Sequence, residues 1–391
     1  MAKKGKHTAQ EPADQEGKSK TLLQRLRVLL IVAVVVLVVA GLTAMEDGTH
    51  LAALRRWLMY GESSSTQDFH VYTADSDNRY GQLGTGLLVA GPNTIQFFRD
   101  SGDAVYDVPV KMKNPQLSVG QRQAVVCDVG GDTLYVLDPL GVRRTMNTDR
   151  GLCYYSARLN SSDYLAVTEQ KNGYKATVSV YNSSGEPVFH FDSYDNYISD
   201  AVVSADCRSV VAVSLESQSG VFASKLLVYD LESAQLVSSR LIRDGLVMDF
   251  TCSQDRVLCL CDKRFVAAGL DGQILLDQAY GNLYLHDYAL NGDGFCALLL
   301  GRYQSGNICT LTTYDAGGAQ LAKMELTEEV LDISAAGDYL AVLYDDALVI
   351  YTRDLQEYAR LAETNYAGQI QMEPDGTVLM ISGASAWRFL P

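Results

Sequence analysis

The sequence predicts an all-β fold, a β-propeller of eight four-stranded blades, preceded by one transmembrane helix. Three observations support this prediction. An uncharged apolar segment follows a basic N-terminus. From residue 69 to residue 391, short runs rich in Val, Leu, Tyr and Thr are separated by Gly, Asp, Asn and Ser, with no amphipathic helix. Two sequence markers recur there with a common period of about 42 residues, which is the length of one propeller blade.

The N-terminal segment is basic and the rest of the chain is strongly acidic. The protein has 391 residues and a formal net charge of −15, of which residues 1–27 contribute +4 and the remainder −19. Binding to a nucleic acid needs clustered Lys and Arg that replace counterions at the phosphates, and the acidic part has no such cluster. We therefore expect no nucleic-acid partner, and we interpret residues 1–27 as a cytoplasmic tail.

The apolar segment, Val28–Met45, has 18 residues without a charge. As a helix it would be roughly 27 Å long, close to the thickness of a bilayer core. Because the positive charges precede it, the positive-inside rule puts the N-terminus in the cytoplasm and the residues after it outside. We expect residues 28–45 to contact the lipid bilayer as a single-pass anchor in the cell membrane. A cleaved signal peptide and a buried core helix are the alternatives.

Residues 46–68 are interpreted as a juxtamembrane helix and a linker. Three leucines follow helical spacing, and Trp57 and Tyr60 suit the headgroup region of a membrane. An ordinary helical stalk explains the same pattern. The polar residues Gly61–Asp68 predict a flexible connection to the extracytoplasmic propeller, residues 69–391.

Two turn markers define the repeat. The first is an apolar strand that ends in Asp or Asn, at Asp100, Asp138, Asn182, Asp230, Asp271, Asp315 and Asp354. The second is an Asp turn that precedes another apolar strand, at Asp163, Asp206, Asp255, Asp293, Asp338 and Asp375. Asp and Asn stabilise tight turns by bonding to nearby backbone N–H groups. We therefore interpret these carboxylates as structural and not catalytic.

Eight third-strand markers, the last at Ala386–Leu390, predict eight blades. The eighth blade shows only three strands before the chain stops. Its outer strand is expected from the start of the domain, at Phe69–Thr73, because such closure removes a free sheet edge. Seven blades are the alternative, if the first repeat is irregular.

The units EPDGTVLMI and SADCRSVVAVS resemble repeats of quinoprotein-like and surface-layer-type propellers, including the YVTN group, and are WD40-like. The whole arrangement resembles a family of single-span, extracytoplasmic propeller proteins of unknown function from Gram-positive bacteria. The resemblance implies an architecture and assigns no catalytic residue. With two Trp in the chain, it also gives no support for a quinone cofactor.

Motifs that carry chemistry are scarce. The chain contains no G-x-S-x-G, Walker or H-E-x-x-H motif. The best-placed titratable pair is His286 with Asp287, on a presumed inner strand, where a surface or hydrogen-bonded histidine is a simpler interpretation than a catalytic base. We therefore predict no catalytic, cofactor-binding or metal-binding residue.

Other candidates are equally weak. Gly84-Thr85-Gly86 lacks the third glycine of a dinucleotide loop, and the acidic run that begins at Asp75 departs from the calcium-loop pattern at Arg79. The pair Asp345-Asp346 is interpreted as a hairpin turn. No C-x-x-C occurs among the eight cysteines, which makes a zinc site improbable. We expect most cysteines to be buried free thiols, although disulfides are possible outside a cell.

The 23 tyrosines offer one hypothesis for recognition. Several are expected near loops or inner strands, namely Tyr154, Tyr155, Tyr194, Tyr197, Tyr284 and Tyr288. They could form a face that binds sugar or peptide, or reflect simple strand propensity. We expect a membrane-anchored, non-catalytic binding or scaffold module that recognises a protein or a cell-envelope glycan. The alternative is a hydrolase or lyase with its site at the central channel, and a sensor or assembly factor is a third hypothesis.

Overall fold

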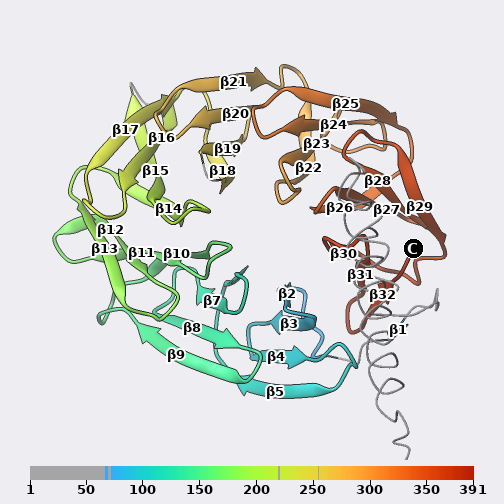
Figure 1. Ribbon diagram of the computed structural model, residues 1–391, viewed down its shortest axis with the longest axis horizontal. Coiled ribbons are helices and arrows are strands. Elements are labelled where there is room, and N and C mark those ends of the chain that lie inside the picture. Colours follow the sequence, from blue (N-terminus) through green and yellow to red (C-terminus); the bar gives the residue numbers. More distant parts are fainter. Residues whose placement is uncertain (1–66, 69–71, 219–220, 254) are drawn as a thin grey trace, which may run out of the picture. The chain divides into compact units, whose positions relative to one another are not determined.

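The computed structural model describes residues 67–68 and 72–391, except residues 219, 220 and 254 (Figure 1). The regular secondary structure of these residues is β-strand throughout, in eight four-stranded sheets. This confirms the predicted eight-bladed propeller and excludes the seven-bladed alternative. The predicted tail, membrane helix and juxtamembrane helix lie outside the described residues. Within the part that the structure describes, no helix has the length and hydropathy needed to span a membrane.

The first four blades lie between residues 79 and 242. Blade 1 contains β2 (Arg79–Leu83), β3 (Gly86–Ala90), β4 (Thr94–Phe98) and β5 (Ala104–Pro109). Blade 2 contains β6 (Pro115–Val119), β7 (Ala124–Asp128), β8 (Thr133–Asp138) and β9 (Gly141–Asn147). Blade 3 contains β10 (Tyr154–Leu159), β11 (Leu165–Lys171), β12 (Tyr174–Tyr181) and β13 (Pro187–Ser193). Blade 4 contains β14 (Tyr197–Val203), β15 (Ser209–Gln218), β16 (Val221–Asp230) and β17 (Leu236–Ile242).

The last four blades complete the ring. Blade 5 contains β18 (Val247–Cys252), β19 (Arg256–Cys261), β20 (Arg264–Gly269) and β21 (Ile274–Ala279). Blade 6 contains β22 (Tyr284–Ala289), β23 (Phe295–Gly301), β24 (Cys309–Asp315) and β25 (Gln320–Leu326). Blade 7 contains β26 (Val330–Ala336), β27 (Tyr339–Tyr344), β28 (Ala347–Thr352) and β29 (Glu357–Ala362). Blade 8 contains β30 (Gln369–Met372), β31 (Val378–Ile381), β32 (Ala386–Phe389) and β1 (Gln67–Asp68).

Every blade is an antiparallel meander whose first strand lies nearest the centre of the ring (Figure 1). The second strands are apolar on both faces because each face packs against a different neighbour. In β19, Cys259 and Cys261 pack toward blade 4, whereas Leu258 and Leu260 pack toward blade 6. Among the described residues, eight clusters of buried apolar side chains fill the eight spaces between blades. Burial of this apolar surface is the main stabilising contribution.

The first strand of the ring closes it, but at a different position from the predicted one. The closing strand is Gln67–Asp68, paired antiparallel with Arg388 and Trp387 of β32, and not Phe69–Thr73. The ring therefore includes two residues that we assigned to the linker. Tyr72, within the expected strand, instead donates its N–H to Ala384 O at 3.1 Å and buries its ring. A strand of two residues is too short to leave a pattern of alternating side chains, so the sequence could not locate it.

A buried arginine ties blade 8 to blade 1 at this closing seam. Arg388 Nε lies 2.9 Å from Glu373 Oε1, and Arg388 also pairs with Asp100 from the outer turn of blade 1. Its Nη2 donates to Thr85 O at 3.2 Å. Burial raises the pKa of Glu373, although Arg388 lies beside it. The marker residue Asp100 thus has a second role, because it holds the two ends of the ring together.

The two faces of the ring differ in their loops. One face, here called the Asp-turn face, carries the turns between the first and second and between the third and fourth strands of each blade. The predicted marker side chains accept backbone N–H bonds in these turns; for example, Asp315 Oδ1 accepts from Gly317 and Ala319, both at 2.8 Å. Equivalent bonds occur at Asp138, Asn182, Asp230 and Asp271. The structural interpretation of these residues is confirmed.

Candidate functional site

The inner strands of four consecutive blades carry an aspartate at an equivalent position. These residues are Asp200, Asp249, Asp287 and Asp332. In each strand the pairing with the second strand shifts by one residue immediately before the aspartate. Such a β-bulge redirects the next side chain and interrupts the regular ladder. The bulges therefore bring four carboxylates to the inner part of the ring, in blades 4 to 7.

Two of these carboxylates share one arginine. Arg158, from β10 of blade 3, places Nη1 2.9 Å from Asp200 Oδ2 and 2.9 Å from Asp249 Oδ1. Its guanidinium carbon lies 5.1 Å from the centroid of the Phe250 ring. Burial opposes the charge of Arg158, but the two carboxylates raise its pKa above the ordinary value. Arg158 therefore links blades 3, 4 and 5 by charge, and it occupies both acids.

The other two carboxylates have no cationic partner among the described residues. Asp287 Oδ2 accepts the N–H of Ile333 from the next blade at 2.9 Å, and Asp332 Oδ2 accepts that of Ile370 at 2.7 Å. Burial raises the pKa of Asp287 to about 6. Burial, together with the nearby charge of Asp287, raises the pKa of Asp332 to about 7. These two acids change protonation state near neutral pH, which is uncommon for Asp.

A central cavity of about 1080 Å³ lies between the inner strands. Arg158, Asp200 and Asp249 line it, together with Tyr288, whose hydroxyl donates to Asp249 Oδ2 at 3.3 Å. The cavity has room for a ligand, but its charged groups already bond to one another. Within the described residues, no group of three or more His, Cys, Asp or Glu side chains is arranged to hold a metal ion.

The opposite face of the ring is here called the aromatic face. It carries the connections between blades and the loops between second and third strands. The exposed aromatic side chains of the described residues all lie there, namely Tyr194, Tyr197, Phe222, Tyr284, Tyr303 and Tyr366. Large rings are costly to leave in water, and clusters of them mark interaction surfaces. This face is therefore the clearest candidate for binding a partner.

Part of the aromatic face is held in place by contacts between side chains. The rings of Tyr174 and Tyr194 have centroids 4.3 Å apart, and Tyr194 OH donates to Tyr174 OH at 3.0 Å. Lys175 Nζ lies 4.4 Å from the centroid of Tyr197. A cation over an aromatic ring orients both groups. These contacts reduce the conformational freedom that the side chains would lose on binding.

The predicted tyrosines fall into two groups. Tyr194, Tyr197 and Tyr284 are exposed at loops or strand ends, as the recognition hypothesis requires. Tyr154 is wrong as a surface candidate, because it is buried in the core between blades 2 and 3. Tyr288 faces the central cavity.

The structure separates the pair His286 and Asp287. Their strand is an inner strand, as predicted, but the bulge between Leu285 and Asp287 disrupts the alternation there. His286 Nε2 lies 2.7 Å from Tyr303 O, and its Nδ1 lies 3.5 Å from Cys309 Sγ. Asp287 bonds instead to backbone N–H groups. The two residues therefore do not form a catalytic dyad.

The remaining candidates have structural places. Gly84-Thr85-Gly86 and Asp345-Asp346 lie at hairpin turns, and Asp75 Oδ1 accepts the N–H of Asp77 at 3.0 Å in a local turn. The eight cysteines are free thiols, five of them buried. Burial raises the pKa of Cys127 to about 12, which keeps this thiol protonated and unreactive at neutral pH.

The sequence contained a signal for the inner aspartates that our reasoning missed. Each lies six residues before one of the predicted turn aspartates, which are Asp206, Asp255, Asp293 and Asp338. The D-x₅-D pattern thus joins an inner bulge to the turn that follows the same strand. The corresponding residue of blade 8 is Gln369, and Arg158 precedes Asp163 by five residues.

Comparison with known structures shows the fold alone, since sequence identity is low. The computationally designed Ika8 protein matches with a TM-score of 0.57 and 12% identity, over 83% of this chain and 100% of that one. The C-terminal WD40 domain of Sif2 matches with a TM-score of 0.56 and 12% identity, over 84% and 98%. The β-propeller domain of Cps50 (Swd1) from Myceliophteria thermophila matches with a TM-score of 0.50 and 14% identity, over 72% and 96%.

No curated protein matches this chain. One family model does, over residues 60–360, which covers most of the chain and seven of its eight blades. The expectation of a WD40-like propeller from a family without a known activity is therefore met. The chain belongs to the family described as "Family of unknown function (DUF5711)".

Proposed function

We propose that this protein is a membrane-anchored, extracytoplasmic binding or scaffold module that recognises a protein or a cell-envelope glycan through its aromatic face. The observation that carries the proposal is the confinement of the exposed aromatic rings to one face of the ring. Tyr and Phe supply large contact areas with few rotatable bonds, and they are enriched at binding hot spots. Ion-paired and hydrogen-bonded carboxylates in the channel favour binding over catalysis.

The direction of the closing strand supports the anchored arrangement. Gln67 pairs with Arg388 and Asp68 with Trp387, so β1 runs from the Asp-turn face toward the aromatic face. The preceding segment is therefore attached to the ring at the Asp-turn face. An anchor at residues 28–45 would join the ring on the side opposite to the aromatic rings. We propose, with the basic tail inside, that the aromatic face is presented to partners outside the membrane.

Site-specific photo-crosslinking in intact cells tests the proposal. A photoreactive residue at Tyr197 or at Tyr284 should give one discrete crosslinked species. The matched control is Leu140, which is 80% exposed on the Asp-turn face. The species should disappear when the neighbouring ring is removed, as in Tyr194→Ser, while thermal unfolding stays unchanged. Equal crosslinking from Leu140, or turnover of a peptide or glycan library by the purified protein, would contradict the proposal.

A second candidate, a hydrolase or lyase, is favoured by one observation. Asp332 combines a pKa of about 7 with a position in a small pocket beside the channel. An acid with that pKa can accept or donate a proton at neutral pH. The test is hydrolysis or elimination by the wild type that Asp332→Asn abolishes.

A further inference from the structure

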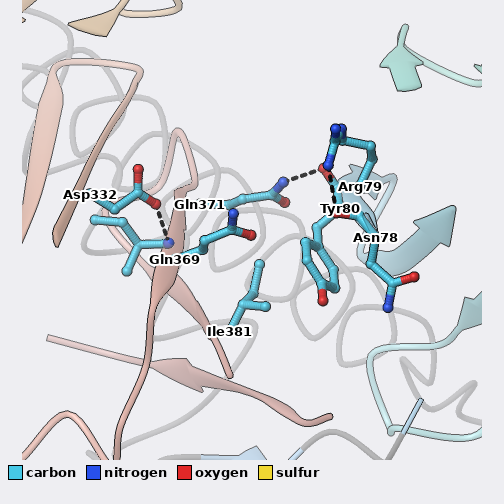
Figure 2. Close-up of a pocket in the computed structure, with 8 residues that line it drawn as sticks. Asn78, Arg79, Tyr80, Asp332, Gln369, Gln371 and Ile381 are labelled. Atoms are coloured by element: carbon cyan, nitrogen blue, oxygen red, sulfur yellow. Dashed lines mark hydrogen bonds between the residues drawn. The ribbon is translucent and has the colours of Figure 1, made fainter. Parts of the chain in front are cut away.

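A second, smaller pocket lies at the closing seam between blades 8 and 1. Its volume is about 330 Å³, at the lower end of the range for small-molecule sites. Residues from the start of β2, from β30, from β31 and from β26 line it (Figure 2). It shares Tyr80 and Gln371 with the central cavity, so a ligand could reach it from the channel. A space of this size suits a small molecule and not a polymer.

One end of this seam pocket is cationic. Arg79 lines it, and its Nη1 makes only long contacts of 3.3 Å, to the carbonyl oxygens of Asp77 and Asn78. No acidic side chain of the described residues forms an ion pair with Arg79. The planar guanidinium can donate two parallel hydrogen bonds to a carboxylate. In a protein with a net charge of −15, such an unpaired arginine in a pocket is a specific attraction for an anion.

The other end offers acceptors. Asp332 lies across the pocket from Arg79, with Gln369 and Gln371 between them (Figure 2). Gln371 Nε2 donates to Tyr80 O at 2.5 Å, whereas its Oε1 is buried without a hydrogen-bond partner among the described residues. A buried acceptor without a donor is unfavourable, and a ligand N–H would satisfy it. Asp332 supplies a negative charge at the same end.

We propose that the seam pocket binds a small zwitterion of the α-amino-acid type, with its carboxylate on Arg79 and its ammonium group on Asp332 and Gln371 Oε1. The two charges of the ligand match the two ends of the pocket in sign and order. The ligand would also bridge β2 and β30, and so add a contact across the seam. This inference does not depend on the aromatic face, because the pocket lies among inner-strand residues.

Isothermal titration of the full chain in detergent at pH 8 tests the proposal with three probes. L-alanine carries both charges, N-acetyl-L-alanine lacks the ammonium group, and L-alaninamide lacks the carboxylate. We expect L-alanine to bind about tenfold or more tightly than either blocked probe, since each blocked probe loses one charged contact. Equal binding of the three probes, or no binding of L-alanine at millimolar concentration, would overturn the proposal.

Two variants identify the site. Arg79→Gln should lose the preference for L-alanine over L-alaninamide, and Asp332→Asn the preference over N-acetyl-L-alanine. Asparagine retains an oxygen that accepts the Ile370 N–H, and Arg79 is exposed, so both variants should fold, which thermal unfolding checks. Arg99→Gln, at an exposed turn of the same blade, is the matched control and should bind as the wild type does. Wild-type preferences in both pocket variants would place any binding elsewhere and refute the site.

Discussion

Arg388 Nε lies 2.9 Å from Glu373 Oε1, and both side chains are buried at the seam where the ring closes. The arginine comes from the last strand of the chain and also pairs with Asp100, in the first blade. Because both partners are shielded from water, the loss of one leaves an uncompensated buried charge. Ring closure therefore depends on electrostatics as well as on backbone pairing.

Replacement of Arg388 by Met should destabilise the protein by roughly 3–5 kcal/mol, the usual cost of removing one partner of a buried ion pair. The free energy of urea unfolding measures the effect. Arg360→Met is the matched control, because Arg360 pairs with Glu357 on an exposed outer strand, and it should cost less than about 1 kcal/mol. Equal losses in the two variants would show that burial of the seam pair is unimportant.

Removal of the closing strand should weaken the ring. A chain that begins after residue 68 lacks β1 and leaves β32 as a free edge, whereas a chain that begins after residue 61 keeps it. We expect a loss of about 1–2 kcal/mol from the missing backbone hydrogen bonds, together with self-association through the free edge. Urea unfolding and analytical ultracentrifugation of the two truncations measure this. Identical behaviour would mean that Tyr72 and the seam ion pair suffice for closure.

The turn aspartates differ in importance, although they look alike in the sequence. Asp315→Ala removes two bonds to backbone N–H groups and should cost about 1–3 kcal/mol. Asp354→Ala should stay within about 0.5 kcal/mol, because in that turn the Thr352 hydroxyl accepts the N–H of Gln356 at 3.3 Å. Thermal unfolding of the pair checks the prediction. The opposite ranking would show that the repeat marker and not the hydrogen bond decides stability.

Protonation of Asp332 should make stability depend on pH. Its pKa is raised from 3.8 to about 7 by burial and by Asp287, while Arg79 lines the same pocket. The folded state then binds the proton more tightly than the unfolded state, so this contribution is complete below pH 4 and is lost as the pH rises to about 7. We expect Asp332→Asn to reduce the loss of stability between pH 5 and pH 8 by an amount on the order of 2 kcal/mol.

Urea unfolding at the two pH values is the measurement for this prediction. Asp346→Asn, in an exposed turn of the same blade, is the control and should leave the pH dependence unchanged. A wild-type pH profile in Asp332→Asn would mean that this acid titrates at an ordinary pKa in the folded protein.

The sequence predicted the ring well because the features that build it are local and periodic. Apolar runs that end in Asp or Asn, such as the one before Asp315, identify strand and turn together. The closing strand was misplaced because its two residues have no periodicity and are selected by β32, more than 300 residues away.

The candidate site was harder to predict because it depends on bulges and on contacts between blades. Arg158 meets Asp200 and Asp249 across three blades, and no local spacing encodes that distance. The repeat of the inner aspartates was present in the sequence, but only the bulges show that they face inward. The seam pocket combines Arg79 with Asp332, which the chain separates by most of its length.

The pairing of β1 with β32 also governs the order of events during synthesis. The strand made first at Gln67 must wait for a partner at Arg388, which is among the last residues that the ribosome adds. Until then the nascent chain is an open arc with an unpaired edge at each end. A truncated translation product cannot finish folding, because it lacks the residues that both pair with β1 and supply the guanidinium. Such a product exposes its edges to proteases, and incomplete copies are therefore readily distinguished from complete ones.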